Sequence, residues 1–564
     1  MSQTLIEKTL REILQEMGVP DPEVRLERPK DPEHGDWASN VALTLAGLLK
    51  RPPREIAQEI AQRFDLDAGG VRAVEVAGPG FLNFRLSSGA IAGVLGTILA
   101  LNGDFGRGQD GEDEPIMVEF VSANPTGPLH LGHGRGAALG DAISTLLEWN
   151  GWRPHREYYY NDAGNQIEIL ARSVWARYQE NLGEEVEFPE KGYHGAYVRD
   201  VAGALAREVG DRFRGDDGPE AMEAVRIFAV AALREEQDRD LAAFRLTFDE
   251  YFLESSLYTE GRVKDTVQAL GKTGLVYQHE GAQWLRTSEF GDQKDRVMIK
   301  SDGSPTYFLP DVAYHMSKWE RGFRHAINVQ GADHHSTVIR VRAGLQALGL
   351  PKGYPEYVLH QMVTVVKDGQ EVKLSKRAGS YTTLRELVDE VGVDVARYFF
   401  LMRKPEAHLV FDLDMALDQS EKNPVYKVQY AHARMCSIFR KASLQEEEIR
   451  ADGVPLEVLS HPLERDLIKR LSDFPEMVAR ATQARSPHTV CEYLEQTAGA
   501  VNAWYHAGNP SRSPELAVLV ENPELRQARL VLARGVQIVL RNGLALLGVS
   551  APTRMERDQE VQDG

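Results

Sequence analysis

The chain has 564 residues, a length typical of three or four domains, and its 42% hydrophobic and 26% charged fractions are those of a globular protein. The formal net charge of −19 argues against non-specific binding of DNA or RNA over the whole surface, but it leaves room for a local basic face. No apolar run is long enough to cross a membrane, and two cysteines are too few for a disulfide framework or a cysteine-based zinc cluster. We therefore expect a cytoplasmic protein with no membrane partner, no DNA partner and no protein-bound zinc.

Residues 1–110 predict a separate α/β domain. Three stretches carry apolar residues at helical spacing, and two shorter apolar stretches flank an Ala-Gly-Pro-Gly turn. We expect helices over residues 5–17, 41–50 and 55–64, and a β-hairpin over residues 74–76 and 81–86. Glycines and aspartates concentrate between Asn102 and Glu114, which indicates a linker to the next domain.

The stretch from Ile116 to Asn150 predicts a strand, an irregular loop and a helix in that order. Residues 116–121 are mostly apolar and β-branched or aromatic, as in a buried strand, and two prolines then force a loop. From Leu131 onward, apolar residues recur at helical spacing. The sequence His130-Leu131-Gly132-His133 therefore stands at the start of the helix.

The start of a helix suits a phosphate group, because it presents free N–H groups and the positive end of the helix dipole. Gly132, Gly134 and Gly136 let a base or a phosphate approach the backbone closely. His130 and His133 are three residues apart, so they share one face of the first helical turn. Two imidazoles placed there can donate hydrogen bonds to phosphate oxygens and to a leaving pyrophosphate.

Two alternatives compete with the phosphate interpretation of this motif. The histidines could bind zinc, although no third ligand lies near them in the sequence. Gly132, Gly134 and Ala137 also fit a dinucleotide fingerprint, with Glu157 following Ala137 by 20 residues as the ribose ligand. In that fingerprint, however, the glycines follow the strand directly, whereas here ten residues with two prolines intervene.

Residues 111–412 alternate predicted strands with predicted helices, which is typical of an α/β fold with a doubly wound, Rossmann-like parallel sheet. A strongly helical, acidic insertion is expected at about residues 180–245, packed outside the sheet. Ligands of such sheets bind at the carboxyl ends of the strands, near the point where the strand order reverses. Beyond the first strand, we expect strands at residues 156–160, 252–253, 307–308, 327–329 and 363–366, and a helix at residues 167–179.

Residues 413–564 predict an all-α helical bundle. Helical periodicity covers residues 424–441, 463–481, 488–505 and 523–547. Pro475 should break or kink the second of these helices. Tyr426, Tyr430 and Arg434 share one helix face, where they could stack on a single-stranded base and pair with it. They could also form a packed face in a bundle that serves only for interaction or capping.

A second motif, Lys373-Leu374-Ser375-Lys376, follows a polar turn that contains Gly369. Two lysines supply compact positive charge and the serine supplies a hydroxyl donor, a combination that suits a polyphosphate. Alone, the segment is only a basic loop. Paired with the histidine motif, which begins 243 residues before Lys373, it becomes specific.

Together the two motifs resemble the HIGH and KMSKS signatures of class I aminoacyl-tRNA synthetases. Further segments resemble arginyl-tRNA synthetases over essentially the whole chain, and the string from Asp394 to Arg397 is close to the D-A-L-R string of that family's C-terminal domain. The second motif departs from the family pattern at Leu374, which replaces Met, and at Arg377. The resembling segments are V-E-F-V-S-A-N-P-T-G-P-L-H-L-G-H-G-R, Y-Y-N-D-A-G-N-Q-I, G-A-D-H-H and N-P-V-Y-K-V-Q-Y-A-H-A-R-M-C-S-I.

The resemblance implies ATP-dependent ligation of L-arginine to tRNA(Arg) through arginyl-adenylate, with release of AMP and pyrophosphate. It implies Mg²⁺ on the ATP phosphates, a C-terminal domain that binds the anticodon and an N-terminal domain that contacts the outer corner of the tRNA. We expect the enzyme to be a monomer. The implied catalytic residues are His130, His133, Lys373, Ser375 and Lys376, and the implied ATP-binding residues are His130, Gly132, His133, Gly134, Gly136, Lys373 and Lys376.

The resemblance also implies an arginine pocket, in which carboxylates hold the planar guanidinium cation in a bidentate fork. The implied guanidinium residues are Glu254, Tyr307 and Asp311, and the implied residues around the α-amino and carboxylate groups are Ser122, Asn124, His133 and Gln330. Asp311 follows Pro310, so it could instead cap the next helix.

Other functions stay open at the level of the sequence. A synthetase for an aliphatic amino acid needs a long editing insertion, and one for cysteine needs a zinc site; this chain has room for neither. A small nucleotidylyltransferase would not need Lys376 or the C-terminal helices. A non-catalytic tRNA-binding paralogue would not need both motifs intact. Adjacent His334 and His335 could bind a metal, but neighbouring side chains point apart.

Overall fold

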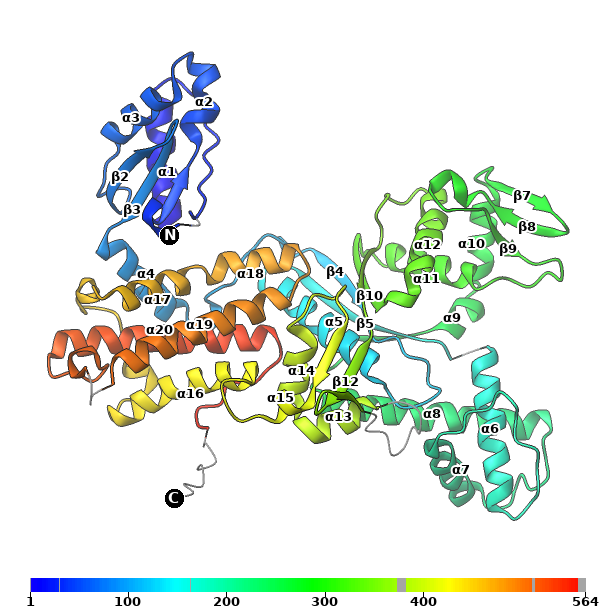
Figure 1. Ribbon diagram of the computed structural model, residues 1–564. Coiled ribbons are helices and arrows are strands. Elements are labelled where there is room, and N and C mark those ends of the chain that lie inside the picture. The colour runs from blue at the N-terminus through cyan, green and yellow to red at the C-terminus, as the bar shows by residue number, and fades with distance from the viewer. Residues whose placement is uncertain (1, 30, 163, 373–381, 510–512, 556–564) are drawn as a thin grey trace, which may run out of the picture.

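The computed structural model describes residues 2–29, 31–162, 164–372, 382–509 and 513–555, and a five-stranded parallel sheet lies at its centre (Figure 1). The strand order is β11-β10-β4-β5-β6, and every neighbouring pair is parallel. The chain builds this sheet outward from β4 in both directions, so the order reverses between β4 and β10. This confirms the doubly wound sheet and places its switch point there. The strands are β4 (Pro115–Glu119), β5 (Arg153–Tyr160), β6 (Glu250–Leu253), β10 (His325–Gly331) and β11 (Glu356–His360).

Helices cover both faces of the sheet, which explains why β4 is apolar on both sides. Ile116 and Val118 are buried in a core that they share with helix α5. Met117, between them, points the other way and joins a second core with α11. The covering helices are α5 (Leu131–Trp149), α11 (Phe308–Glu320) and α12 (His335–Ala347). Helix α5 begins within the histidine motif, as its pattern predicts.

One strand expected in this domain is absent, and another is present but belongs to a different sheet. Residues 307–308 do not form a strand, because Tyr307 precedes α11 and Phe308 is its first residue. Residues 363–366 do form a strand, but it belongs to a separate small sheet of order β13-β12-β14. An antiparallel sheet, β7-β8-β9, was not expected. These strands are β12 (Val363–Lys367), β13 (Gln370–Glu371), β14 (Leu409–Asp412), β7 (Val276–His279), β8 (Ala282–Leu285) and β9 (Arg296–Ile299).

The helical insertion forms a unit with its own core, at the lower right of Figure 1. Leu170, Val174 and Val198 are among the residues buried there. The unit therefore stays outside the sheet, as its acidic composition indicates. Its helices are α6 (Asn165–Asn181), α7 (Ala196–Val209) and α8 (Pro219–Ala243), and the chain then continues through α9 (Glu254–Thr259) and α10 (Arg262–Gly271).

The N-terminal region carries an antiparallel sheet of order β1-β3-β2 with three helices, and lies apart at the upper left of Figure 1. The three expected helices and the hairpin are confirmed. Lys469 of the C-terminal bundle forms an ion pair with Asp36 at 2.5 Å, and Arg28 pairs with Asp473. The elements are α1 (Ser2–Glu16), α2 (Val41–Leu49), α3 (Pro53–Arg63), β1 (Trp37–Ser39), β2 (Val71–Ala77) and β3 (Phe81–Leu86).

The C-terminal region is a helical bundle, as predicted, and the earlier helix α4 (Ser88–Leu101) packs on it. The expected break at Pro475 is confirmed, because one helix ends at Ser472 and the next begins at Phe474. In the described part of the chain, no helix combines the length and the apolarity needed to cross a membrane. The remaining helices are α13 (Leu384–Val391), α14 (Val393–Leu401), α15 (Leu413–Leu417), α16 (Pro424–Lys441), α17 (Pro462–Ser472), α18 (Phe474–Gln483), α19 (His488–Ala507) and α20 (Pro523–Leu546).

Candidate active site

A cavity of about 720 Å³ opens at the switch point of the parallel sheet, beside the carboxyl ends of β4 and β10. Its wall brings together residues from six separate parts of the chain. The expected site residues that line it are Ser122, Asn124, His130, Gly132, His133, Gly136, Glu254, Tyr307, Asp311 and Gln330. A doubly wound sheet collects strand ends at one edge, which explains why residues so distant in sequence meet here.

His130 and His133 form a stacked pair at the start of α5. Their rings are 3.6 Å apart between centroids and inclined by 15°. His130 Nδ1 accepts the His133 N–H at 3.2 Å, and His133 Nδ1 accepts the His130 N–H at 3.3 Å. Burial lowers the pKa of both rings, and that of His133 lies well below its usual range. Both rings are therefore neutral at pH 7 and carry their proton on Nε2, where each is a hydrogen-bond donor.

The glycines of this motif have different surroundings. Gly132 and Gly136 line the cavity. A Cβ on Gly136 would lie 3.0 Å from His360 Nε2, so the cavity wall is tight there. Gly134 does not line the cavity, because it faces the core: a Cβ would lie 2.6 Å from Leu384 Cδ1. Gly134 therefore permits close packing of α5, and its expected contact with ATP stays a prediction.

The loop after β4 carries Ser122 and Asn124 on an unusual backbone. Val121 and Ser122 have φ values of 67° and 44°, which non-glycine residues rarely adopt. Ser122 Oγ donates to Glu119 Oε1 at 3.1 Å and accepts the Tyr159 N–H at 3.2 Å. Surrounding contacts thus hold the loop in an unfavourable backbone conformation, which is common at ligand sites.

Two carboxylates meet at the other end of the cavity. Glu254 begins α9, and Tyr159 donates its hydroxyl to Glu254 Oε2 at 2.8 Å. Burial raises the pKa of Glu254, and burial together with the charge of Glu254 raises the pKa of Asp311 to about 7. Asp311 lies in the fourth position of α11, after Tyr307 as the capping residue, so the helix-cap alternative for Asp311 fails. Two acids in a buried site favour a bound cation.

A buried ion pair supports the floor of this pocket. Lys318 Nζ lies 2.6 Å from Glu119 Oε2 and donates to Asn328 Oδ1 at 3.0 Å. Asn328 in turn contacts His315 Nε2 at 2.7 Å. This network could not be predicted from the sequence, because Glu119 and Lys318 are 199 residues apart. The one sign of it in the sequence is that each of these charged residues has apolar neighbours.

Gln330 and Tyr307 complete the wall. The Oε1 atom of Gln330 is buried and accepts no hydrogen bond from the residues that the structure describes. A buried acceptor of this kind calls for a donor, and an ammonium group bound in the cavity would supply one. Tyr307 is 77% exposed and therefore stands at the mouth of the pocket.

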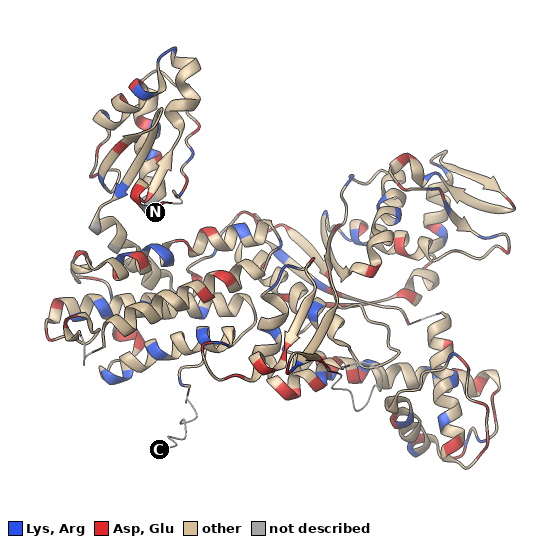
Figure 2. Ribbon diagram, viewed as in Figure 1, with Lys and Arg blue, Asp and Glu red and all other residues tan. Residues whose placement is uncertain are grey.

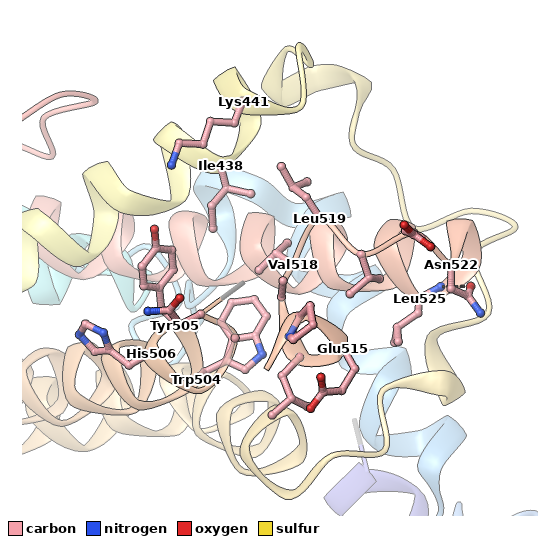
Figure 3. A pocket seen from close by; sticks show the side chains of 17 residues that line it. Ile438, Lys441, Trp504, Tyr505, His506, Glu515, Val518, Leu519, Asn522 and Leu525 are labelled. Atoms are coloured by element: carbon pink, nitrogen blue, oxygen red, sulfur yellow. Dashed lines mark hydrogen bonds between the residues drawn. The ribbon is translucent and has the colours of Figure 1, made fainter. Parts of the chain in front are cut away.

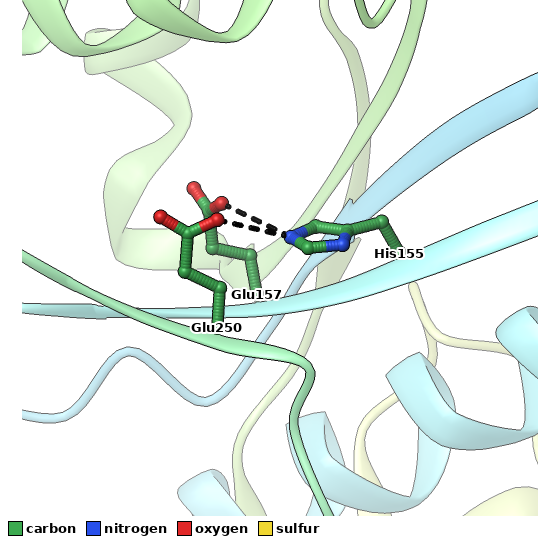
Figure 4. Close-up of side chains that lie close together, drawn as sticks. All are labelled: His155, Glu157 and Glu250. Atoms are coloured by element: carbon green, nitrogen blue, oxygen red, sulfur yellow. Dashed lines mark ion pairs between the residues drawn. The ribbon is translucent and has the colours of Figure 1, made fainter. Parts of the chain in front are cut away.

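Glu157, the acid of the dinucleotide alternative, is fully buried away from the cavity. It accepts from Tyr314 at 2.7 Å and pairs with Arg321 at 2.7 Å, so it is not available to a ribose. His155, Glu157 and Glu250 form the one group of possible metal ligands among the residues searched, and Figure 4 shows them together. Arg321 also lies 2.9 Å from Glu250, so we assign the group to an ion-pair network.

Lys373, Ser375 and Lys376 lie outside the described residues, but the flanks of their segment are placed. Val372 N–H donates to Val365 O at 3.0 Å on one side. On the other side, Leu384 N–H donates to Leu129 O at 2.7 Å, and Thr383 forms an antiparallel bridge with His130. Thr383 and Leu384, which follow this segment in the sequence, are therefore fastened to His130 and Leu129.

A second cavity, of about 780 Å³, lies in the C-terminal bundle near the ends of α16 and α19 (Figure 3). Trp504, Tyr505 and His506 line it, with Lys441 beside them. It is larger than the first cavity but lacks a cluster of titratable groups suited to catalysis. Figure 2 shows acidic and basic residues interspersed along these helices.

Tyr426, Tyr430 and Arg434, the expected RNA-contact residues, form a packed helix face. Tyr426 and Arg434 are 8% and 9% exposed. Arg434 donates to Asn502 Oδ1 at 2.5 Å and lies over the rings of Tyr430 and Tyr505 at 4.7 and 4.3 Å. Both side chains are largely buried in this structure, and the contact of this helix face with tRNA stays a prediction.

Comparison with known proteins defines the class of this site. The family model for the catalytic domain of class I (R) tRNA synthetases matches residues 95–404. The model for the arginyl-tRNA synthetase N-terminal domain matches residues 3–86, and that for the DALR anticodon-binding domain matches residues 428–555. The sheet, the histidine pair at the helix start and the adjoining cavity are thus those of a class I tRNA synthetase.

Curated relatives narrow the class to one family. An arginine–tRNA ligase of Geobacter metallireducens is 52% identical over 545 residues, which cover 95% of this chain and 95% of the relative. That of Geotalea uraniireducens is 52% identical over 542 residues, with the same coverage of 95% for both chains. The solved arginyl-tRNA synthetase of Thermus thermophilus has a TM-score of 0.73 at 25% identity, over 98% of this chain and 100% of that one. The chain belongs to the arginine–tRNA ligase family.

Proposed function

We propose that this chain ligates L-arginine to tRNA(Arg) at the expense of ATP, through arginyl-adenylate, and releases AMP and pyrophosphate. The observation that carries the proposal is the composition of one cavity. A pair of neutral histidine donors at a helix start lies on one side of it, and two buried carboxylates lie on the other. The first side suits phosphates and the second suits a guanidinium group.

Arginine would bind with its guanidinium group at Glu254 and Asp311. Its cation would lower the raised pKa of Asp311 by supplying the missing opposite charge. Tyr307 would cover the guanidinium from the mouth of the pocket. Ser122, Asn124 and Gln330 are the polar groups left for the α-amino and carboxylate groups, and the buried Gln330 Oε1 is a suitable acceptor for the ammonium. The substrate carboxylate would then face the histidine pair.

The first step needs positioning and charge stabilisation more than covalent chemistry by the protein. The arginine carboxylate is ionised at pH 7, so it can attack the α-phosphorus of ATP directly while pyrophosphate leaves. His130 and His133 would donate from Nε2 to the phosphates. Lys373, Ser375 and Lys376 would approach from the flank that Leu129 and Leu384 join. Mg²⁺ on the phosphate oxygens would neutralise part of their charge.

In the second step a 2′-hydroxyl of the tRNA's terminal adenosine would take the arginyl group, as is usual for class I enzymes. The match to an anticodon-binding domain supports the C-terminal bundle as the part that reads the tRNA. Its cavity offers exposed His506, half-buried Tyr505 and the basic Lys441, a combination that suits an unstacked base and its phosphate. We further expect a cytoplasmic monomer. Its two cysteines, Cys436 and Cys491, are buried free thiols.

ATP–pyrophosphate exchange with each amino acid, with and without tRNA, tests the proposal. Arginine should drive exchange, and charged tRNA(Arg) should accumulate in a parallel assay. Exchange driven by lysine or glutamate in place of arginine would refute the amino-acid assignment. Tight binding of tRNA with no exchange for any amino acid would favour a non-catalytic tRNA-binding protein.

A further inference from the structure

We propose that Gln237 is a positioning residue, which holds the loop that carries Ser122 and Asn124 in the shape that arginine requires. The inference rests on the proposed function, because it takes arginine to be the ligand of that loop. Gln237 lies in α8 of the helical insertion and is 1% exposed. It does not line the cavity, so it can act only through the loop.

The loop between β4 and α5 has few hydrogen bonds of its own, among them Ser122 N–H to Phe120 O at 3.0 Å and Thr126 N–H to Asn124 O at 2.8 Å. It belongs to no helix or strand, and its two prolines have no N–H group to donate. Val121 and Ser122 have positive φ values of 67° and 44°, which cost energy in any non-glycine residue. Such a backbone persists only where neighbouring groups impose it.

For Ser122 these groups are Glu119 and Tyr159 of the sheet, and the helical insertion holds the loop residues that follow. Gln237 Nε2 donates to Asn124 O at 3.0 Å and to Gly127 O at 2.9 Å, so both of its N–H hydrogens are used. Its Oε1 lies 3.3 Å from the Tyr158 hydroxyl, which accepts the Ala123 N–H and donates to Ala123 O, each at 3.0 Å. One buried amide thus holds two carbonyl groups of the loop and lies beside the tyrosine that holds a third point.

A second side chain of the insertion holds the same loop. Tyr197 of α7 donates its hydroxyl to Thr126 O at 2.8 Å. The carbonyl groups of residues 124, 126 and 127 therefore all accept a hydrogen bond from α7 or α8, and Asn124 O accepts a second one from the Thr126 N–H. Because buried carbonyl groups need partners, loss of these donors should let the loop move.

The histidine pair is held by different contacts. His130 and His133 bond to each other's backbone, and Leu129 bonds to Leu384. None of these contacts involves the insertion. A weakened hold on the loop should therefore affect the arginine side of the cavity and spare the phosphate side. This difference separates a positioning role from general stabilisation.

The insertion contains a matched control for Gln237. Gln179 of α6 is 0% exposed, donates to Phe213 O at 2.7 Å and accepts the Gly215 N–H at 2.9 Å, far from the cavity wall. Gln237→Met and Gln179→Met remove equivalent buried amides. We expect Gln237→Met to raise the KM for arginine roughly tenfold, as the loss of about 1.4 kcal/mol would, with the KM for ATP within about twofold. Gln179→Met should change neither KM, whatever it does to the melting temperature.

A second pair of variants, with milder substitutions, tests the inference if Gln237→Met does not fold. Tyr197→Phe removes only the hydroxyl that holds Thr126 O, and Tyr178→Phe removes a hydroxyl that donates to Gly210 O at 2.8 Å inside the insertion. Tyr197→Phe should raise the KM for arginine about threefold, and Tyr178→Phe should not.

Arginine KM values that are equal within each pair of variants, or equal rises in the KM for arginine and for ATP, would overturn the inference. Both quantities come from arginine-dependent ATP–pyrophosphate exchange by the full chain in the presence of tRNA. If the unsubstituted chain shows no such exchange, the proposed function itself fails. The two failures are therefore distinguishable.

Discussion

Asp311→Asn tests the electrostatic basis of arginine selection. The substitution keeps the shape of the side chain but removes one of the two negative charges that meet in the pocket. A hydrogen bond to a charged group contributes about 1.5–3 kcal/mol, and loss of one partner of a close charge pair costs at least ~2 kcal/mol. The value of kcat/KM for arginine should therefore fall at least about 30-fold, with the KM for ATP nearly unchanged.

The pH profile gives the same prediction a second readout. Burial and the neighbouring Glu254 raise the pKa of Asp311 to about 7 in the free enzyme. A guanidinium group binds the ionised acid, so kcat/KM for arginine should fall about tenfold per pH unit below that pKa. Asp311→Asn should lose this acid limb. The assay is arginine-dependent ATP–pyrophosphate exchange between about pH 5.5 and 8.5. An unchanged KM and kcat, or an acid limb retained in the variant, would remove Asp311 from the pocket.

Three further predictions concern stability and tRNA binding. Lys318→Met leaves the buried Glu119 charge unpaired, so urea unfolding should show a loss of about 3–5 kcal/mol; a loss below about 1 kcal/mol would contradict the role of the pair. Burial would raise the pKa of Glu157, but Arg321 and other partners hold it at about 2, so its stabilisation is present above about pH 5 and is lost as the pH falls toward that pKa. The urea midpoint of Glu157→Gln should not fall in this way at acid pH. Identical pH profiles of the urea midpoint for the two proteins would contradict this role of Glu157. Lys441→Ala should raise the KM for tRNA and lower its salt dependence by about 0.7–0.9 in log–log slope, with the KM for arginine unchanged; an unaltered salt slope would place Lys441 away from the tRNA backbone.

The sequence predicted the fold well where a single pattern dominates. The apolar run of β4 and the helical spacing of α5 were sufficient to place the central strand, the loop and the helix. The antiparallel strands β7–β9 were missed because each has only four residues and lacks a regular alternation. Tyr307 and Phe308 were mistaken for a strand because two aromatic residues are too few to show whether apolar positions repeat as in a strand or as in a helix. A sequence pattern thus predicts an element only where it extends over several helical turns or several alternations of a strand.

The candidate site divides along a similar line. Residues at strand ends and at the start of α5 could be predicted, because a doubly wound sheet brings such positions to one edge. The residues that hold them could not. Gln237 bonds to Asn124 across 113 residues, and nothing in the helical, acidic pattern around it marks this glutamine as buried. Arg135, fully buried, donates to the carbonyl groups of Gln361, Lys404 and Ala407, and only its place in an apolar helix hints at this.

Helix α4 has a consequence for the synthesis of the chain. Leu95 and Ile98 are fully buried, and Leu95 lies against α20 near Gly535. Asn542 of α20 also donates to Asn102 O, 440 residues earlier. At about 5–20 residues per second, the ribosome would need roughly 20–90 s to make the partner that covers this apolar face. The apolar face of α4 must therefore stay exposed on the nascent chain through most of translation. A chaperone is the natural partner to bind it during that interval.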